Sequence, residues 1–101
     1  MENKKHFKIW NKIIGNTSRG IDYAGREIVK SAYGDEKSKY GWNIDHILPK
    51  SKDGKNNTEN LIVAHILTNQ EKGDNFSEFS ANGKKFKILK KENGEWKIKE
   101  I

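Results

Sequence analysis

The chain has 101 residues, of which only 33% are hydrophobic, so it is long enough for one small domain, 1–101, with a limited core. It contains no cysteine and no apolar run near the ~20 residues that cross a bilayer, which excludes disulfides, thiolate zinc sites and membrane spans; because the N-terminus also lacks the apolar segment of a signal peptide, we expect a cytoplasmic protein. Twenty basic and 14 acidic residues give a net charge of +6, which suits a nucleic-acid partner but also an ordinary solubilising surface.

The N-terminal third begins with a helical pattern and then becomes ambiguous. Residues 3–14 place apolar side chains on one helix face, and Gly15 follows where such a helix would end. His6 has no partner within this segment and is expected at the helix surface. Residues 21–34 combine helical spacing with β-branched and aromatic residues, and we favour a short helix over a strand. The polar stretch at 34–41 is expected to be a linker.

The central third predicts a strand, a long polar loop, a second strand and a helix. Residues 42–46 alternate in polarity, as a strand with two different faces does. A loop rich in Lys, Asn and Asp follows at 48–60, and the apolar run 61–64 is interpreted as the returning strand. Residues 66–72 suit a short helix that ends near Gly73.

The C-terminal segment predicts a β-hairpin over 84–101. Its strands are expected near 85–91 and 96–100, where apolar and basic residues alternate. Asn93-Gly94 between them is a strong hairpin signal, because both central residues of such a turn need positive φ. One face is expected to carry the apolar residues Leu89, Trp96 and Ile98. We interpret the hairpin as a cover for the core, with DNA contact as the alternative.

The stretch from Asn43 to Asp74 contains the residue types that phosphodiester hydrolysis requires. This chemistry needs a water nucleophile, a base to activate it and positive charge on the phosphate oxygens. A histidine suits the base, and a carboxylate with an amide oxygen suits a magnesium ion; His46, Asp45 and Asn69 supply these groups. Asp45 and His46 are neighbours, so they share a cleft only if the strand ends or bends before Pro49.

The pattern DHILPKS…NTENL…TNQEKGD, within 42–76, resembles the HNH endonuclease family. The family pattern is an Asp-His pair followed by Pro, a polar loop, Asn-Leu and a final Asn before a Lys-Gly-Asp tail. Asn60 lies 14 residues after His46 and Asn69 nine after Asn60, which is similar to the HNH domain of RNA-guided CRISPR nucleases. The resemblance implies an α+β fold: a small ββα-metal HNH finger, here braced by the N-terminal helix and the C-terminal hairpin.

The resemblance also implies roles for individual residues. His46 would be the general base, and Asn60 would complete the catalytic set by pinning the polar loop that holds His46. Asp45 and Asn69 would be the ligands of Mg²⁺ or Mn²⁺. Lys72 would lie near the scissile phosphate, although a cation that complements the helix C-terminus is the alternative interpretation.

His65 is a candidate further ligand or phosphate contact, because it precedes Asn69 by four residues and would share a helix face with it. Packing or hydrogen bonding is the alternative role. Some HNH proteins carry zinc-binding cysteines where this chain has His65 and Thr68, so we expect no structural zinc. The expected DNA contacts are Lys50, Lys52 and Lys55, with Arg19 and Arg26 as further candidates.

These features together predict a metal-dependent DNA endonuclease with weak sequence preference. The expected partner is DNA and not a membrane, and a homodimer or a larger nuclease assembly is left open. The alternative is a nucleic-acid-binding module of a phage or defence assembly that keeps the finger without catalysis. A regulatory interaction protein is a third interpretation, for which no residue provides specific support.

Overall fold

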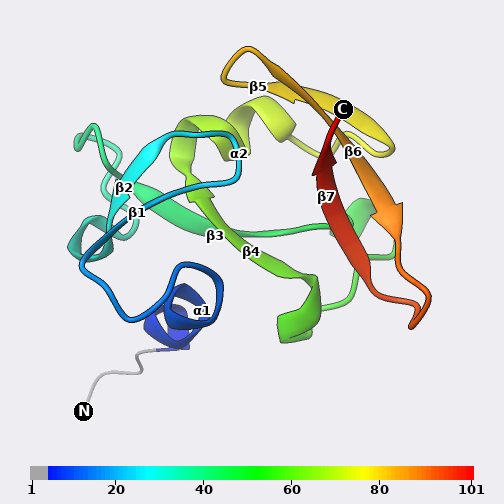
Figure 1. The fold of residues 1–101 in the computed structure, drawn as a ribbon, viewed down its shortest axis with the longest axis horizontal. Coiled ribbons are helices and arrows are strands. Elements are labelled where there is room, and N and C mark those ends of the chain that lie inside the picture. The colour runs from blue at the N-terminus through cyan, green and yellow to red at the C-terminus, as the bar shows by residue number, and fades with distance from the viewer. Residues whose placement is uncertain (1–4) are drawn as a thin grey trace.

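The computed structural model describes residues 5–101, which form an α+β arrangement of short antiparallel sheets and two α-helices (Figure 1). The elements in chain order are α1 (Lys5–Ile13), β1 (Arg19–Ile21), β2 (Glu27–Val29), β3 (Trp42–His46), β4 (Leu61–His65), α2 (Ile66–Lys72), β5 (Glu78–Ala81), β6 (Lys84–Lys90) and β7 (Trp96–Glu100). Single turns of 3-10 helix lie at Lys30–Ala32, Lys50–Lys52 and Thr58–Asn60. The α+β class expected from the sequence is confirmed. Neither helix is long and apolar enough to cross a membrane.

The predicted N-terminal helix is confirmed as α1 over its described part, while residues 3 and 4 lie outside the described residues. Its apolar face buries Ile9 and Trp10. The helix ends where the N–H groups of Ile14 and Gly15 both turn back to the Trp10 carbonyl. His6 does have a partner outside the helix, because its ring stacks on that of Tyr33 with centroids 3.9 Å apart.

The expectation of a short helix over 21–34 is wrong. β1 and β2 form a two-stranded antiparallel sheet, and only the 3-10 turn at Lys30–Ala32 is helical. The Asp22 carboxylate accepts the backbone N–H groups of Ala24 and Arg26 at 3.0 and 2.9 Å, which stabilises the turn between the strands. That side-chain contact decides between the two patterns.

The predicted strand, loop, strand and helix of the central third are confirmed as β3, the 47–60 segment, β4 and α2. β3 pairs with β4 from Trp42↔His65 to His46↔Leu61 without interruption. α2 follows β4 directly and ends at Gly73, whose N–H donates to the Asn69 carbonyl at 2.9 Å. In Figure 1 this helix lies over the β3–β4 pair, close to β5.

The C-terminal hairpin is confirmed as β6 and β7, but its turn differs from the expected one. Of Asn93 and Gly94, only Gly94 has positive φ, at 88°, and its N–H donates to the Lys91 carbonyl. The hairpin also gains a third strand, β5, which the sequence analysis did not predict. β5 joins β6 through Asn82-Gly83, where both residues have positive φ, at 53° and 75°.

The expected apolar face of the hairpin is wrong at one position. Ile88 pairs with Ile98, so the inward face carries Ile88 together with Ile98 and Trp96. Leu89 is paired with Lys97 and therefore projects from the opposite face, because neighbouring strand residues point to opposite sides.

Two apolar clusters include residues that pack with the β3–β4 pair. Figure 1 shows α1 on one side of this pair and the sheet of β5, β6 and β7 on the other. We call the two clusters the N-terminal cluster and the C-terminal cluster. The buried members of the N-terminal cluster are Ile9, Trp10, Ile28, Ala32, Trp42, Leu61 and Val63. Those of the C-terminal cluster are Ala24, Ile47, Phe79, Ala81, Phe86 and Ile88. Ile44 of β3 packs on the N-terminal cluster and Ile62 of β4 packs on the C-terminal cluster, so the β3–β4 pair is supported by both clusters.

Candidate active site

β3 and α2 bring Asp45 and Asn69 to one open pocket of about 580 Å³. Asn43 and Asp45 are two residues apart on β3 and therefore share a strand face. α2 crosses that face and contributes Asn69, and Glu36 approaches from the 34–41 linker. The remaining lining residues are Gly34, Ile44, Ile66, Gln70 and Gly73. Among residues 5–101, two carboxylates and no basic side chain line the pocket.

The Asn69 amide is oriented by the hydrogen bonds of its nitrogen, whereas its oxygen has no hydrogen-bond partner among residues 5–101. Its Nδ2 donates to the Asn43 side-chain oxygen and, at 3.4 Å, to the Ala64 carbonyl. Its Oδ1 is buried, and no residue in 5–101 donates a hydrogen bond to it. A buried acceptor without a partner is unfavourable by about 1–3 kcal/mol. A cation that reached this oxygen would remove that penalty.

Asp45 is held by its neighbours while its carboxylate stays 29% exposed. Its Oδ1 accepts the His46 backbone N–H at 2.8 Å, and its Oδ2 lies 3.8 Å from the Lys72 ammonium. With the Asn69 amide oxygen, it offers the hard oxygen donors that Mg²⁺ and Mn²⁺ prefer. Within residues 5–101, no three His, Cys, Asp or Glu side chains are grouped as metal ligands, so an ion here would keep several waters.

Lys72, which was expected to lie near the scissile phosphate, has a completely buried side chain, so its ammonium is not exposed to contact a phosphate in this structure. Its ammonium donates to the His46 carbonyl at 2.9 Å and lies 5.9 Å from the centre of the Phe79 ring. Burial lowers the pKa of Lys72, and the nearby Asp45 carboxylate acts in the opposite direction. The buried Lys72 ammonium therefore contacts the His46 backbone and lies near the Asp45 carboxylate at the end of β3.

His46 ends β3 but does not line the pocket of Asp45 and Asn69. β3 remains paired through His46↔Leu61, so the bend that would bring both side chains to one cleft is absent from this strand. The His46 Nε2 lies 2.9 Å from the Asn56 side-chain oxygen. An amide oxygen only accepts hydrogen bonds, so Nε2–H is the donor in this contact.

Asn60 is buried and uses its whole amide to close the polar loop. Its Oδ1 accepts the Leu48 N–H at 2.9 Å, and its Nδ2 donates to the carbonyls of Leu48 and Lys55 at 3.1 and 2.8 Å. The same loop requires Gly54, since a Cβ there would lie 1.8 Å from the Leu48 carbonyl oxygen. Asn60 thus fixes the segment that carries Asn56, the partner of His46.

The lysines proposed to contact DNA differ from the arginines in their freedom. Lys50, Lys52 and Lys55 are exposed on the loop and form no ion pair with any residue in 5–101. Arg19 is paired with Glu27 at 2.7 Å, and Arg26 with Glu71 at 2.5 Å. The three lysines therefore remain available, whereas both arginines already have carboxylate partners.

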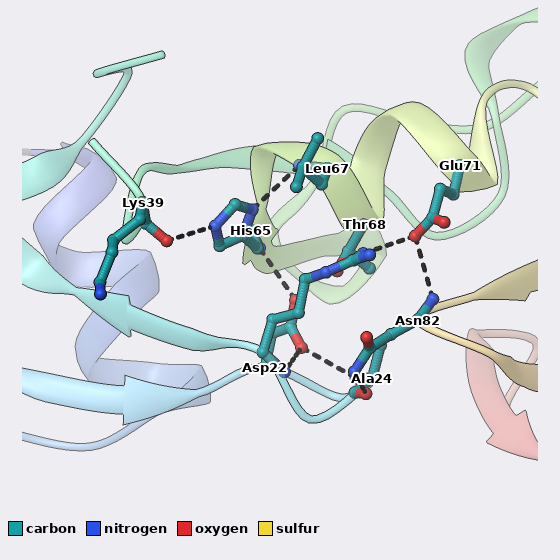
Figure 2. Close-up of polar contacts among 9 residues, drawn as sticks. Asp22, Ala24, Lys39, His65, Leu67, Thr68, Glu71 and Asn82 are labelled. Carbon is teal, nitrogen blue, oxygen red and sulfur yellow. Dashed lines mark hydrogen bonds and ion pairs between the residues drawn. The ribbon is translucent and has the colours of Figure 1, made fainter. Parts of the chain in front are cut away.

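His65 lies away from the Asn69 pocket and is occupied on both ring nitrogens (Figure 2). It ends β4 and caps α2, with Nδ1 accepting the Leu67 N–H at 3.0 Å. Its Nε2 donates to the Lys39 carbonyl at 2.8 Å. The expected shared helix face with Asn69 is wrong, because His65 precedes the helix. Its contacts are those of a structural residue.

A polar network missed by the sequence analysis joins the β1–β2 turn, the end of β4 and the β5–β6 turn around α2 (Figure 2). The second Asp22 oxygen accepts the His65 N–H at 2.9 Å, which links the β1–β2 turn to the end of β4. Glu71 accepts from both the Arg26 guanidinium and the Asn82 N–H, the latter at 3.0 Å in the β5–β6 turn. Those two donors lower the pKa of Glu71. The partners lie far apart in sequence, so only the Asp22 turn had a local signal.

Comparison of the chain with known proteins identifies a family. No curated protein and no solved structure matches the chain. A family model described as HNH endonuclease matches residues 23–77, which include β2, β3, β4 and α2 and make up more than half of the chain. The resemblance found in the sequence is therefore confirmed, and the chain belongs to the HNH endonuclease family.

Proposed function

We propose that this protein is a metal-dependent endonuclease that hydrolyses DNA phosphodiester bonds. The observation that carries the proposal is the pocket of Asp45, Asn69 and Glu36, which has carboxylates and an unpartnered amide oxygen but no basic side chain. Such a pocket repels a phosphate and attracts a cation. A phosphate would therefore enter it only together with a divalent ion.

Asp45 and Asn69 are the residues that would hold Mg²⁺ or Mn²⁺. The ion would stabilise negative charge that develops on the phosphate oxygens. Asn43 supports this assignment as an orienting residue, because it occupies the Asn69 Nδ2 and leaves Oδ1 for a ligand. Lys72 also supports the assignment as an orienting residue, because its ammonium lies 3.8 Å from the Asp45 carboxylate.

His46 is proposed as the general base, with Nδ1 as the atom that accepts the proton of water. Its Nε2–H is engaged by Asn56, so the imidazole is held in the tautomer that leaves Nδ1 unprotonated. Asn60 keeps the Asn56 loop closed and acts as a positioning residue. The exposed Lys50, Lys52 and Lys55 would contact DNA phosphates, which carry no sequence information.

A plasmid-nicking assay with Mg²⁺, with Mn²⁺ and with a chelator tests the proposal. Loss of a general base is expected to lower the rate of His46→Ala by roughly 10²–10⁴-fold. Asn69→Ala should also be slower and should require more metal. His6→Ala, which removes a histidine that does not line the pocket, is the matched control and should keep the wild-type rate. Equal nicking by wild type and His46→Ala, or no nicking with any divalent ion, would contradict the assignment.

A non-catalytic nucleic-acid-binding module is the alternative function, and one observation favours it. His46 and Asp45 leave opposite faces of β3, so the base and the metal ligands do not share the same pocket. Calorimetric titration with Mg²⁺, combined with the nicking assay, separates the two functions. Duplex binding that is tight, indifferent to metal and without nicking would support the module and reject the nuclease.

A further inference from the structure

The positive charge of the chain lies outside the segment that matches the HNH family. Residues 23–77 contain eight basic and eight acidic residues and so have no net charge. Residues 78–101 contain seven basic and four acidic residues, an excess of three, and the first 22 residues supply the other three charges. The C-terminal sheet therefore carries charge that the matched domain does not.

Four lysines concentrate this charge on the outer face of the C-terminal sheet. The inward positions of β6 are the buried Phe86 and Ile88, so the alternate residues project outward. We call this surface the lysine face; it consists of Lys85, Lys87, Lys97 and Lys99. Lys87 is half-buried, and the other three are exposed.

The arrangement of the lysine face is unfavourable for a protein without a polyanionic partner. Lys87 and Lys99 lie directly opposite each other on β6 and β7, and like charges in that position destabilise a sheet. Glu78 is the cross-strand neighbour of Lys87 on β5, yet none of the four lysines forms an ion pair with a residue in 5–101. A partner that carries regularly spaced negative charge would remove the repulsion.

We propose that the lysine face is a docking surface for the phosphate backbone of duplex DNA. Lysine ammonium groups bind phosphate as point charges and need no particular base sequence. The face carries no aromatic side chain for stacking unpaired bases, and Leu89 is its one large apolar residue in the paired strands, which offers little to a membrane. The choice of DNA among duplex polyanions rests on the proposed nuclease function.

The C-terminal hairpin lies beside the polar loop that carries Lys50, Lys52 and Lys55. The β6–β7 turn borders the polar loop, where Lys55 lines a small pocket together with Gly94, Glu95 and Trp96. The C-terminal sheet thus borders the loop that carries Lys50 and Lys52. None of its residues lines the pocket of Asp45 and Asn69. The lysine face adds a second group of phosphate contacts that lies outside the family match.

The test measures how salt weakens binding of the full chain to a labelled duplex, with a chelator present so that no cleavage occurs. The variant Lys87→Gln/Lys99→Gln is compared with Lys8→Gln/Lys37→Gln, which removes two exposed lysines elsewhere and changes the net charge equally. Each lost phosphate contact lowers the slope of log affinity against log salt by roughly 0.9. The test pair should therefore lower it by about 2, and the control pair by much less. Equal slopes for the two pairs would overturn the proposal.

Two further measurements keep the outcome unambiguous. Removing opposed charges should leave the urea midpoint unchanged or raised, so weaker binding cannot be attributed to unfolding. Hydrolysis of bis(p-nitrophenyl) phosphate needs no docking surface, so its rate should be the same in the test pair and in wild type. If wild type hydrolyses none of this substrate but the salt slope still changes in the test pair, the nuclease function is rejected and the docking surface is not. Preferential binding to phosphatidylserine vesicles, lost in the same pair, would overturn duplex docking.

Discussion

Lys72 is a fully buried cation whose position is explained by its contacts and not by the solvent. Its ammonium touches the His46 carbonyl and faces the Asp45 carboxylate, so it connects the last two residues of β3 to the end of α2. Desolvation of the charge is the larger influence on its pKa, which is lowered. The charge is therefore retained at a thermodynamic cost, and we infer that it positions Asp45 and His46.

Lys72→Met is expected to separate positioning from stability. Methionine fills similar volume without a charge, and Asp45 is exposed enough to be hydrated, so the free energy of unfolding should change by no more than about 1 kcal/mol. The nicking rate should nevertheless fall, because Asp45 and His46 lose their common contact. Urea unfolding and the nicking assay check this result, with Lys37→Met as the exposed control. Unchanged nicking would show that Lys72 has no positioning role.

The same substitution has a predictable pH dependence. Because the pKa of Lys72 is lower in the folded protein than its ordinary 10.5, the unfolded chain binds more protons between those two values. Wild-type stability should therefore rise relative to Lys72→Met as the pH increases toward 10.5, and the difference should be constant at lower pH. A wild-type stability that falls relative to Lys72→Met in that alkaline window would contradict a lowered pKa.

The sequence could predict some site residues and not others for physical reasons. The approach of Asn69 to Asp45 follows from a strand pair covered by a helix. The position of Asn43 on the same face as Asp45 could have been inferred from the alternation of residues in β3. The burial of Lys72 could not be predicted from the sequence, because its neighbour Phe79 belongs to β5, a strand that was not predicted. The tautomer of His46 likewise depends on Asn56, whose loop conformation has no local signature.

At the scale of elements, Glu71 joins α2 to two turns that come from distant parts of the chain. It accepts from Arg26 of the β1–β2 turn and from Asn82 of the β5–β6 turn. Arg26 also donates to Thr68 at 3.1 Å, so the guanidinium bridges two positions of the helix. These contacts fix how α2 lies on β3, and α2 carries Asn69. The network therefore supports the pocket without touching it.

Glu71→Gln is expected to weaken this junction in a pH-dependent manner. The pKa of Glu71 lies below its ordinary 4.5 in the folded protein, mainly because of the hydrogen bond from Arg26. Its stabilisation should be fully present above about pH 4.5 and should disappear as the pH falls through the folded value. The urea midpoints of both proteins should differ near neutrality and converge once the pH has fallen below the folded pKa of Glu71. A constant difference at every pH would exclude this ionisation as the cause.

Two turns explain which elements were missed in the sequence. Residues 21–34 contain apolar residues at both helix and strand spacing, and the Asp22 carboxylate resolves the ambiguity by capping a turn. Asn82-Gly83 is the same dipeptide as Asn93-Gly94, and it adopts the two positive φ angles that were expected at the later site. β5 was overlooked because its four residues have too short an alternation to be distinguished from a loop.

At the scale of the whole molecule, the β3–β4 pair is held between two separate apolar clusters. Trp10 and Trp42 pack with ring centroids 5.0 Å apart in the N-terminal cluster, while Phe79 and Phe86 stack at 5.4 Å in the C-terminal cluster. The sequence analysis expected bracing by α1 and by the hairpin, and both elements contribute to these clusters. Because β3 and β4 contact both, we infer that the clusters unfold together.

A matched pair of substitutions tests this cooperativity. Ile9→Val truncates the N-terminal cluster and Ile88→Val the C-terminal cluster, at residues that are 3% and 4% exposed. Each should destabilise the protein by about 0.5–1.5 kcal/mol. Because Trp96 packs on the C-terminal cluster, the comparison is made in a Trp96→Phe background. There Trp10 and Trp42 report on the N-terminal cluster by fluorescence, whereas far-ultraviolet circular dichroism reports on the whole backbone. If the β3–β4 pair couples the clusters, Ile88→Val should shift both signals to the same urea midpoint. A fluorescence transition that stays at the midpoint of the Trp96→Phe background while the dichroism transition moves would mean that the two sides unfold independently, and that β3 is supported from each side separately.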